Sequence, residues 1–94
     1  ITENGMANND VIVDGKINDS KRIKFYSDHL VECFKLFENG IPLKGYFAWS
    51  LLDNFEWAFG YSKRFGLVYV DFDNLKRVPK LSWEEFRRYL KSQK

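Results

Sequence analysis

Apolar residues recur every three or four positions between residues 19 and 39, and this spacing predicts an amphipathic helix. The apolar stripe consists of Ile23, Tyr26, Leu30, Cys33, Phe34 and Phe37, and the opposite face carries Arg22, Lys24, Asp28, Glu32 and Lys35. Asp19 suits the N-cap of this helix, Gly40 is a stop signal, and Pro42 prevents continuation.

A second pattern is the uninterrupted apolar run Gly45-Tyr46-Phe47-Ala48-Trp49. It does not alternate polar with apolar residues, which is typical of a strand covered on both faces. Residues 1–3 are interpreted as the last part of an earlier strand, because two β-branched residues lead into Glu3 and the turn Asn4-Gly5 follows. The polar residues 6–18 predict a long surface loop, with a short extended piece at 11–13.

The last third of the chain predicts an aromatic-rich excursion over residues 50–64, an extended piece over 65–72 and a turn at Asp73-Asn74. Ser82, followed three residues later by Glu85, has the spacing of a capping box. This pattern predicts a final helix over 82–92, with Trp83, Phe86 and Leu90 turned inward.

The resulting order is strand, helix, strand, helix, which is typical of a parallel sheet. Parallel strands are stable when both faces and both edges are covered. The chain has too few elements to close such a sheet, so we expect it to be part of a larger arrangement of β/α units.

Composition narrows the class of protein. The chain has 94 residues, enough for one small domain, and 18% of them are aromatic, which argues against disorder. The formal net charge of +2 gives no case for a nucleic-acid or membrane partner, and no apolar run of about 18 residues is present. The basic residues, Arg22 and Arg64 among them, are interpreted as a solvated surface. Cys33 is the only cysteine, so an internal disulfide is excluded.

Candidate chemistry follows from the predicted strands, since ligands of parallel β/α barrels bind at the C-terminal ends of the strands. Glu3, Trp49 and the pair Glu56-Trp57 all follow such ends. Carboxylates and indole faces together suit a sugar, and a pair of carboxylates could hydrolyse a glycoside. The residues alone leave other readings open: a surface acid for Glu3, core packing for Trp49, and a helix-start acid with a packing indole for Glu56 and Trp57.

Two other polar residues are interpreted as structural. His29 lies beside the apolar stripe of the first helix, where a hydrogen-bonded structural histidine is favoured over a ligand or a base. Asp53 is expected to cap the turn after Leu52. The sequence contains no glycine-rich phosphate loop, no Cys/His metal spacing and no nucleophile elbow.

Several long motifs, in the right order, carry a resemblance to a known family. "ITENG" resembles the nucleophile motif of glycoside hydrolase family 1, the β-glucosidase type. "GYFAWSLLDNFEW", followed by "GYSKRFGLVYVDF", resembles the last strand of that family and the loop after it, and "DSKRIKFYSDHL" resembles its seventh helix. The resemblance implies a C-terminal β-α-β-α portion (strands 7–8, helices 7–8) of a TIM (β/α)8 barrel, with residues 1–94 as one fragment of a single domain.

The resemblance also implies roles for individual residues. Glu3 matches the nucleophile of a retaining β-glucosidase, and Trp49 matches the tryptophan under the sugar. Glu56 matches the acid that holds two glucose hydroxyls, Trp57 its neighbour, and Phe65 an aromatic on the wall of that subsite. A carboxylate at Glu56 would repel a sugar phosphate, so unphosphorylated glucosides are the expected substrates, with galactosides or fucosides as further candidates. Cofactors and metals are not expected.

One departure from the family pattern limits the expected activity. The general acid/base should lie in an Asn-Glu-Pro motif, and none occurs in the sequence. We therefore expect the isolated chain to be inactive without the remainder of the barrel polypeptide, and to self-associate through its open edges. An alternative is a catalytically dead relative that acts as a carbohydrate- or protein-binding module. A third is a quarter-barrel folding fragment.

Overall fold

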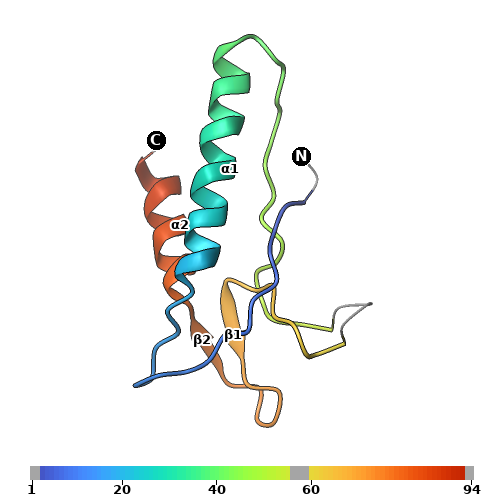
Figure 1. Cartoon of the computed structure of the whole chain (residues 1–94), viewed down its shortest axis with the longest axis vertical. Helices are drawn as coiled ribbons and strands as arrows, with labels where there is room; N and C mark the ends of the chain where they lie inside the picture. Colours follow the sequence, from blue (N-terminus) through green and yellow to red (C-terminus); the bar gives the residue numbers. More distant parts are fainter. Residues whose placement is uncertain (1–2, 56–59, 93–94) are drawn as a thin grey trace.

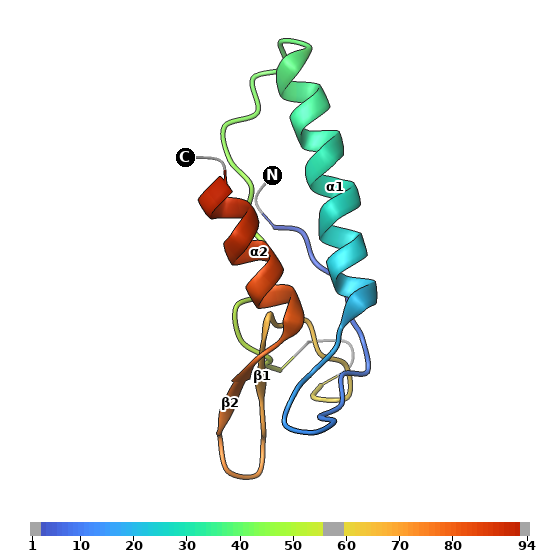
Figure 2. The same cartoon turned by 90° about the vertical axis from the view of Figure 1, so that its left-hand side faces the viewer.

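The computed structural model describes residues 3–55 and 60–92 and consists of a helix, a hairpin and a second helix. The elements are α1 (Ser20–Glu38), β1 (Val68–Val70), β2 (Arg77–Pro79) and α2 (Leu81–Ser92). The two helices lie side by side and run in the same direction, and the hairpin extends from the start of α2 (Figure 1, Figure 2). The helices predicted over 19–39 and 82–92 are therefore confirmed to within about a residue at each end.

The apolar stripe of α1 is buried only near its N-terminal half. Tyr26 is 4% exposed and its ring contacts that of Phe86 on α2, with the centroids 5.8 Å apart. Towards the other end, Phe34 and Phe37 are 50% and 62% exposed. The helix ends before Gly40, whose φ of +82° suits the glycine of a C-terminal cap.

The prediction of a solvated polar face on α1 is wrong for Arg22, which is fully buried. Its guanidinium donates to the carboxylate of Asp19 at 2.6 Å. Asp19 occupies the predicted N-cap position, but its side chain makes no capping hydrogen bond to α1. Burial is possible for Arg22 because a carboxylate compensates the charge that it takes out of water.

The predicted capping box of the last helix is wrong in its contacts. The helix α2 begins at Leu81, and Ser82 lies within its first turn. The Ser82 hydroxyl donates to Asp19 Oδ2 and its backbone N–H donates to Asp19 Oδ1. Asp19 therefore joins the starts of the two helices. Trp83 and Phe86 are partly buried as predicted, whereas Leu90 is 52% exposed.

The two predicted parallel strands meet at one point of contact. Asn4 pairs with Ala48 in a parallel bridge, and neither 3–5 nor 45–49 forms a longer regular strand. The parallel direction predicted from the order of elements is thus confirmed, while the length of the strand is not. Asn4 was expected in a turn with Gly5 and instead makes this bridge. Residues 1–2 lie outside the described part of the chain.

The extended piece predicted over 65–72 contains β1, and its partner β2 was not predicted. The two strands pair antiparallel, with Tyr69 opposite Val78. A further parallel bridge joins Leu52 to Val68. The apolar residues 11–13 do not form a strand; Val13 pairs with Lys16 across a tight turn, and all three are exposed.

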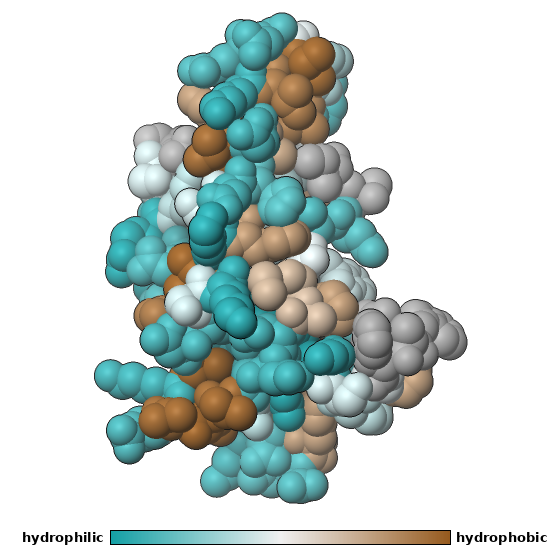
Figure 3. Space-filling model, in the orientation of Figure 1, coloured by the Kyte–Doolittle hydropathy of each residue, from teal (hydrophilic) through white to brown (hydrophobic). Residues whose placement is uncertain are grey.

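The interior of the described residues is unusually polar. Its buried apolar side chains are Ile17, Tyr26, Leu67 and Val70, and its buried charged ones are Asp10, Asp19, Arg22, Asp53 and Lys80. Apolar patches lie instead on the surface, at the upper end of α1 and near the 13–16 turn (Figure 3). Neither described helix combines the length and the apolar character needed to cross a bilayer.

Candidate functional site

The parallel contact between the first residues and residues 47–49 places two predicted site residues on one face. The Asn4 N–H donates to Phe47 O at 3.0 Å, and the Trp49 N–H donates to Asn4 O at 2.7 Å. Side chains alternate between the faces of such a pairing. Asn4 and Ala48 therefore share one side, and Glu3, Phe47 and Trp49 share the other, which we call the Glu3 face.

Exposure distinguishes the two sides. Glu3 is exposed, and Phe47 and Trp49 are 65% and 40% exposed. On the opposite side, Tyr46 lies against both helices, in a groove that it shares with Leu30 of α1 and Phe86 of α2. The Glu3 face is thus open, and a carboxylate and an indole are available on it together.

The chain passes very close to itself at this point, and a glycine permits it. A Cβ atom on Gly5 would overlap the carbonyl oxygen of Trp49 and would lie 2.9 Å from its carbonyl carbon. The same carbonyl oxygen accepts a hydrogen bond from the Tyr26 hydroxyl at 3.0 Å. The peptide bond between Trp49 and Ser50 is cis.

A second tyrosine holds the residue next to Glu3. The Tyr46 hydroxyl donates to Asn4 Oδ1 at 2.6 Å. Burial raises the pKa of Tyr26 to about 12, and burial also raises the pKa of Tyr46 above its ordinary value. Both hydroxyls therefore keep their protons, and remain donors, throughout the neutral range.

Phe65 is tied to the segment that follows Trp49. The Ser50 N–H donates to Phe65 O at 3.1 Å, and the Leu67 N–H donates to Ser50 O at 2.9 Å. Phe65 is partly buried. In this pairing, Phe65 thus lies next to Ser50, the residue that follows Trp49. The predicted pair Glu56 and Trp57 lies outside the described residues.

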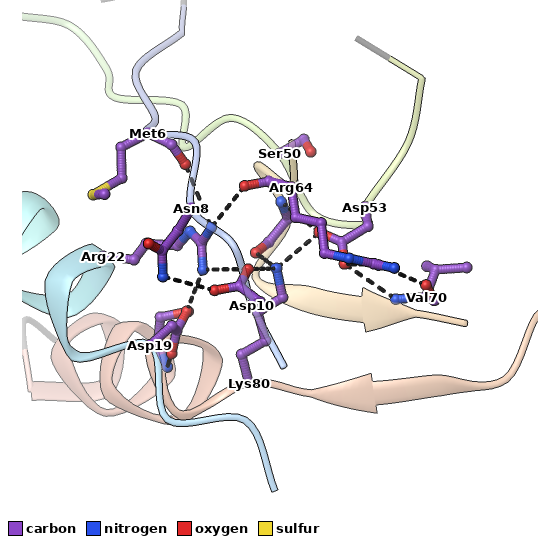
Figure 4. Close-up of polar contacts among 12 residues, drawn as sticks. Met6, Asn8, Asp10, Asp19, Arg22, Ser50, Asp53, Arg64, Val70 and Lys80 are labelled. Carbon is purple, nitrogen blue, oxygen red and sulfur yellow. Dashed lines mark hydrogen bonds and ion pairs between the residues drawn. The ribbon is translucent and has the colours of Figure 1, made fainter. Parts of the chain in front are cut away.

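Behind these segments lies a buried cluster of charges that the sequence did not predict, formed by Asp10, Asp19, Arg22, Asp53, Arg64 and Lys80 (Figure 4). We call it the charge cluster. Lys80 donates to Asp10 at 2.6 Å and to Asp53 at 2.7 Å, and Asp10 also pairs with Arg22 at 2.9 Å. The three cations and three carboxylates match in number, so each buried charge has an opposite partner.

Asp53 connects the charge cluster to the backbone around Phe65. Its carboxylate accepts hydrogen bonds from Lys80, from Arg64 at 2.8 Å and from the Gly66 N–H at 2.9 Å. Burial alone would raise the pKa of Asp53, but the hydrogen bonds from Lys80 and Arg64 outweigh it and lower that pKa. Asp53 is structural, as expected, but it holds residues 64–70 rather than capping the turn after Leu52.

Arg64 was expected on a solvated surface and instead has several partners. Its guanidinium donates to the carbonyl oxygen of Val70 at 2.7 Å and lies 4.1 Å from the ring centroid of Tyr69. Its own carbonyl oxygen accepts from Arg22 at 2.8 Å and from the Asn8 N–H at 3.0 Å. Arg64 is therefore held through both its side chain and its backbone carbonyl group.

The two remaining candidates have structural surroundings. His29 Nδ1 lies 2.7 Å from Phe25 O, a hydrogen bond within one turn of α1, which agrees with the structural role favoured from the sequence. Cys33 is a free thiol, partly buried on α1. Within residues 3–55 and 60–92, no three or more His, Cys, Asp and Glu side chains are grouped so as to hold a metal ion.

The comparison with known proteins agrees with this architecture. The model of glycosyl hydrolase family 1 matches residues 1–94. β-Glucosidase A of Thermotoga maritima is 57% identical over 81 residues, which make up 85% of this chain and 18% of that relative. A bifunctional β-D-glucosidase/β-D-fucosidase of Bifidobacterium breve is 48% identical over 95 residues, 96% of this chain and 21% of the relative.

Solved structures give the same result. A family 1 β-glucosidase from Exiguobacterium antarcticum B7 superposes with a TM-score of 0.96 at 49% identity, covering 98% of this chain and 21% of that chain. A family 1 β-glucosidase from Thermotoga maritima, in complex with isofagomine lactam, superposes at 0.95 with 51% identity, covering 97% and 21%. The chain spans about a fifth of the length of the relatives that it matches. The predicted fold class, a β-α-β-α portion of a TIM barrel, is confirmed, and the chain belongs to glycosyl hydrolase family 1.

Proposed function

We propose that residues 1–94 contribute one part of a single barrel domain to a retaining β-glucosidase, with Glu3 as its nucleophile. The observation that carries the proposal is the register of the pairing between Asn4 and Ala48, which sets Glu3 and Trp49 on the same open face. The relatives named above are β-glucosidases, and one of them also acts as a β-fucosidase.

In the proposed reaction, a Glu3 carboxylate oxygen forms a bond to the anomeric carbon while the bond to the leaving-group oxygen breaks. A second carboxylic acid, supplied by the remainder of the barrel, protonates that oxygen. The same group then takes a proton from water, which attacks the anomeric carbon and releases Glu3. The two carboxyl groups of a retaining enzyme lie about 5–5.5 Å apart, so the missing acid should face Glu3 across the open face.

The neighbouring aromatic residues suit the sugar. In the proposed complex, Trp49 covers the apolar C–H face of the ring and Phe65 forms a wall beside it. We further propose that Glu56 accepts hydrogen bonds from two sugar hydroxyls, with Trp57 next to it. Because a carboxylate at Glu56 would repel a phosphate group, the proposed substrates are unphosphorylated β-glucosides, with galactosides or fucosides as alternatives.

We propose that residues 1–94 alone do not turn over substrate. General acid assistance contributes about 10²–10⁴-fold, and the sequence contains no Asn-Glu-Pro motif to supply it. The apolar groove between α1 and α2, of about 550 Å³ and lined by Leu30, Val31 and Phe34 among others, is open in the part of the chain that the structure describes. The remainder of the barrel is the proposed occupant of such surfaces, and self-association is the expected substitute when residues 1–94 are alone.

A chimera tests the proposal. Residues 1–94 replace the matching segment of the Thermotoga maritima β-glucosidase A, and the product is assayed with an aryl β-glucoside. We expect turnover by the chimera, loss of at least about a thousandfold with Glu3→Gln, and no change with Asp14→Asn, a matched exposed acid on a loop. A 2-deoxy-2-fluoro glucoside should label Glu3, as located by peptide mass analysis.

Three results would contradict the proposal. They are a label on another residue, unchanged turnover with Glu3→Gln, and robust turnover by residues 1–94 alone. Sugar binding without turnover in the chimera would instead support the binding-module alternative.

A further inference from the structure

We propose that Tyr26 and Tyr46 are positioning residues, whose hydroxyl groups fix Trp49 and Glu3 relative to each other from the side opposite the Glu3 face. This inference rests on the proposed function, because it concerns the placement of the proposed nucleophile and of the aromatic residue that would cover the sugar. Neither hydroxyl would touch the sugar, since Tyr26 lies on α1 and the side chain of Tyr46 lies on the side of the pairing that faces the helices.

The first contact acts on the residue after Glu3. The Tyr46 hydroxyl donates to Asn4 Oδ1, and the backbone of Asn4 makes both hydrogen bonds of the parallel pairing, one to Phe47 and one to Trp49. The side chain and the backbone of Asn4 are thus held by the same segment. A shift of Asn4 along the pairing would move Glu3 with it, because the two residues share a peptide bond.

The second contact acts on Trp49 itself. Its carbonyl oxygen accepts from the Tyr26 hydroxyl at 3.0 Å, and Gly5 packs against the same carbonyl group closely enough to exclude a Cβ atom. Tyr26 is 4% exposed and its ring is fixed against Phe25 and Phe86. The carbonyl of Trp49 therefore has a rigid donor on one side and the chain at Gly5 on the other.

The two contacts predict different kinetic effects. Removal of the Tyr46 hydroxyl loosens the residue next to the nucleophile, so kcat should fall. Removal of the Tyr26 hydroxyl loosens the proposed sugar platform, so KM should rise. The loss of one neutral hydrogen bond corresponds to a change of about three- to tenfold in either constant.

The test uses the chimera with Tyr46→Phe or Tyr26→Phe, each of which removes one oxygen atom. The matched control is Tyr89→Phe, a partly buried tyrosine on α2 that lines the groove between the helices. Active sites are counted by titration with the fluorinated glucoside, so that a smaller folded fraction does not pass for a lower kcat. We expect kcat per site to fall with Tyr46→Phe, KM to rise with Tyr26→Phe, and neither constant to change with Tyr89→Phe.

Two further measurements separate positioning from general stability. In an Asn4→Ala background, Tyr46→Phe should have no additional effect, because the acceptor of its hydrogen bond is gone. Hydrogen exchange at the backbone N–H of Trp49, which donates to Asn4, should be about three- to tenfold faster in both tyrosine variants, and this readout needs no turnover.

The inference is overturned if kcat, KM and this exchange rate are the same in the two variants as in Tyr89→Phe. It is also overturned if Tyr46→Phe keeps its full effect in the Asn4→Ala background. Failure of the proposed function shows itself separately, as turnover that survives Glu3→Gln while the exchange effects persist.

Discussion

Replacing Lys80 by methionine tests whether the charge cluster stabilises the fold. Lys80 is fully buried, and its ammonium group donates to Asp10, Asp53 and the carbonyl oxygen of Gly66 at 2.6–2.7 Å. All three of its protons are therefore used. Methionine fills a similar volume but leaves three buried acceptors without this donor.

The expected cost follows from the partners that remain. Breaking a buried ion pair costs about 3–5 kcal/mol. Asp10 keeps Arg22 at 2.9 Å and Asp53 keeps Arg64 at 2.8 Å, so neither carboxylate is left without a cation. We therefore expect Lys80→Met to lower the free energy of unfolding by an amount at the lower end of this range, about 3 kcal/mol. This corresponds to a change of roughly a hundredfold in the unfolding equilibrium constant.

The assay is equilibrium urea unfolding of residues 1–94, followed by circular dichroism and by tryptophan fluorescence. The chain concentration is kept fixed, because self-association would add to the apparent stability. The control is Lys24→Met, which removes an exposed ion pair with Asp28 and should cost no more than about 0.5 kcal/mol. A difference between the two variants of less than about 1 kcal/mol would refute the reasoning.

Two further predictions concern the backbone and the pH dependence. Gly66→Ala would place a Cβ atom 2.6 Å from the carbonyl carbon of Leu52 and should lower the free energy of unfolding by about 1–3 kcal/mol. In the control Gly45→Ala, the new Cβ atom meets only a side chain at 3.7 Å, so the loss should be smaller. The urea midpoints of the two variants test this, and equal midpoints would contradict the prediction. Because the folded pKa of Asp53 lies below its unfolded value of about 3.9, its contribution to stability is present above that pH and is lost as the pH falls through the folded pKa. Urea unfolding between pH 6 and pH 2 should therefore show a loss that is smaller in Asp53→Asn, and the same loss in both proteins would argue against this role.

The elements that depend on local spacing could be predicted from the sequence. The three- and four-residue period determines α1, and the order of strands and helices correctly predicts the parallel direction of the contact, although Asn4 was assigned to a turn. The same logic places Glu3 and Trp49 at one edge. These predictions need only the chain's own periodicity and the handedness of β/α units.

The charge cluster could not be predicted, because burial of a charge is decided by partners far along the chain. Lys80 pairs with Asp10, 70 residues earlier, and nothing in the residues around Lys80 distinguishes it from a solvated lysine. The capping box failed for the same reason, since a carboxylate 63 residues away takes the hydroxyl of Ser82. The strand β2 was missed because its pattern, Arg-Val-Pro, is short, exposed at both ends and contains a proline.

The polar interior has a consequence for the thermodynamics of this chain. The heat capacity change of unfolding grows with the apolar surface that becomes exposed, and polar surface reduces it. Residues 1–94 bury paired charges and leave Phe34, Phe37 and Phe47 exposed. Their folding alone therefore hides little apolar surface. We therefore expect a small heat capacity change when residues 1–94 unfold alone, and a stability that varies only gently with temperature.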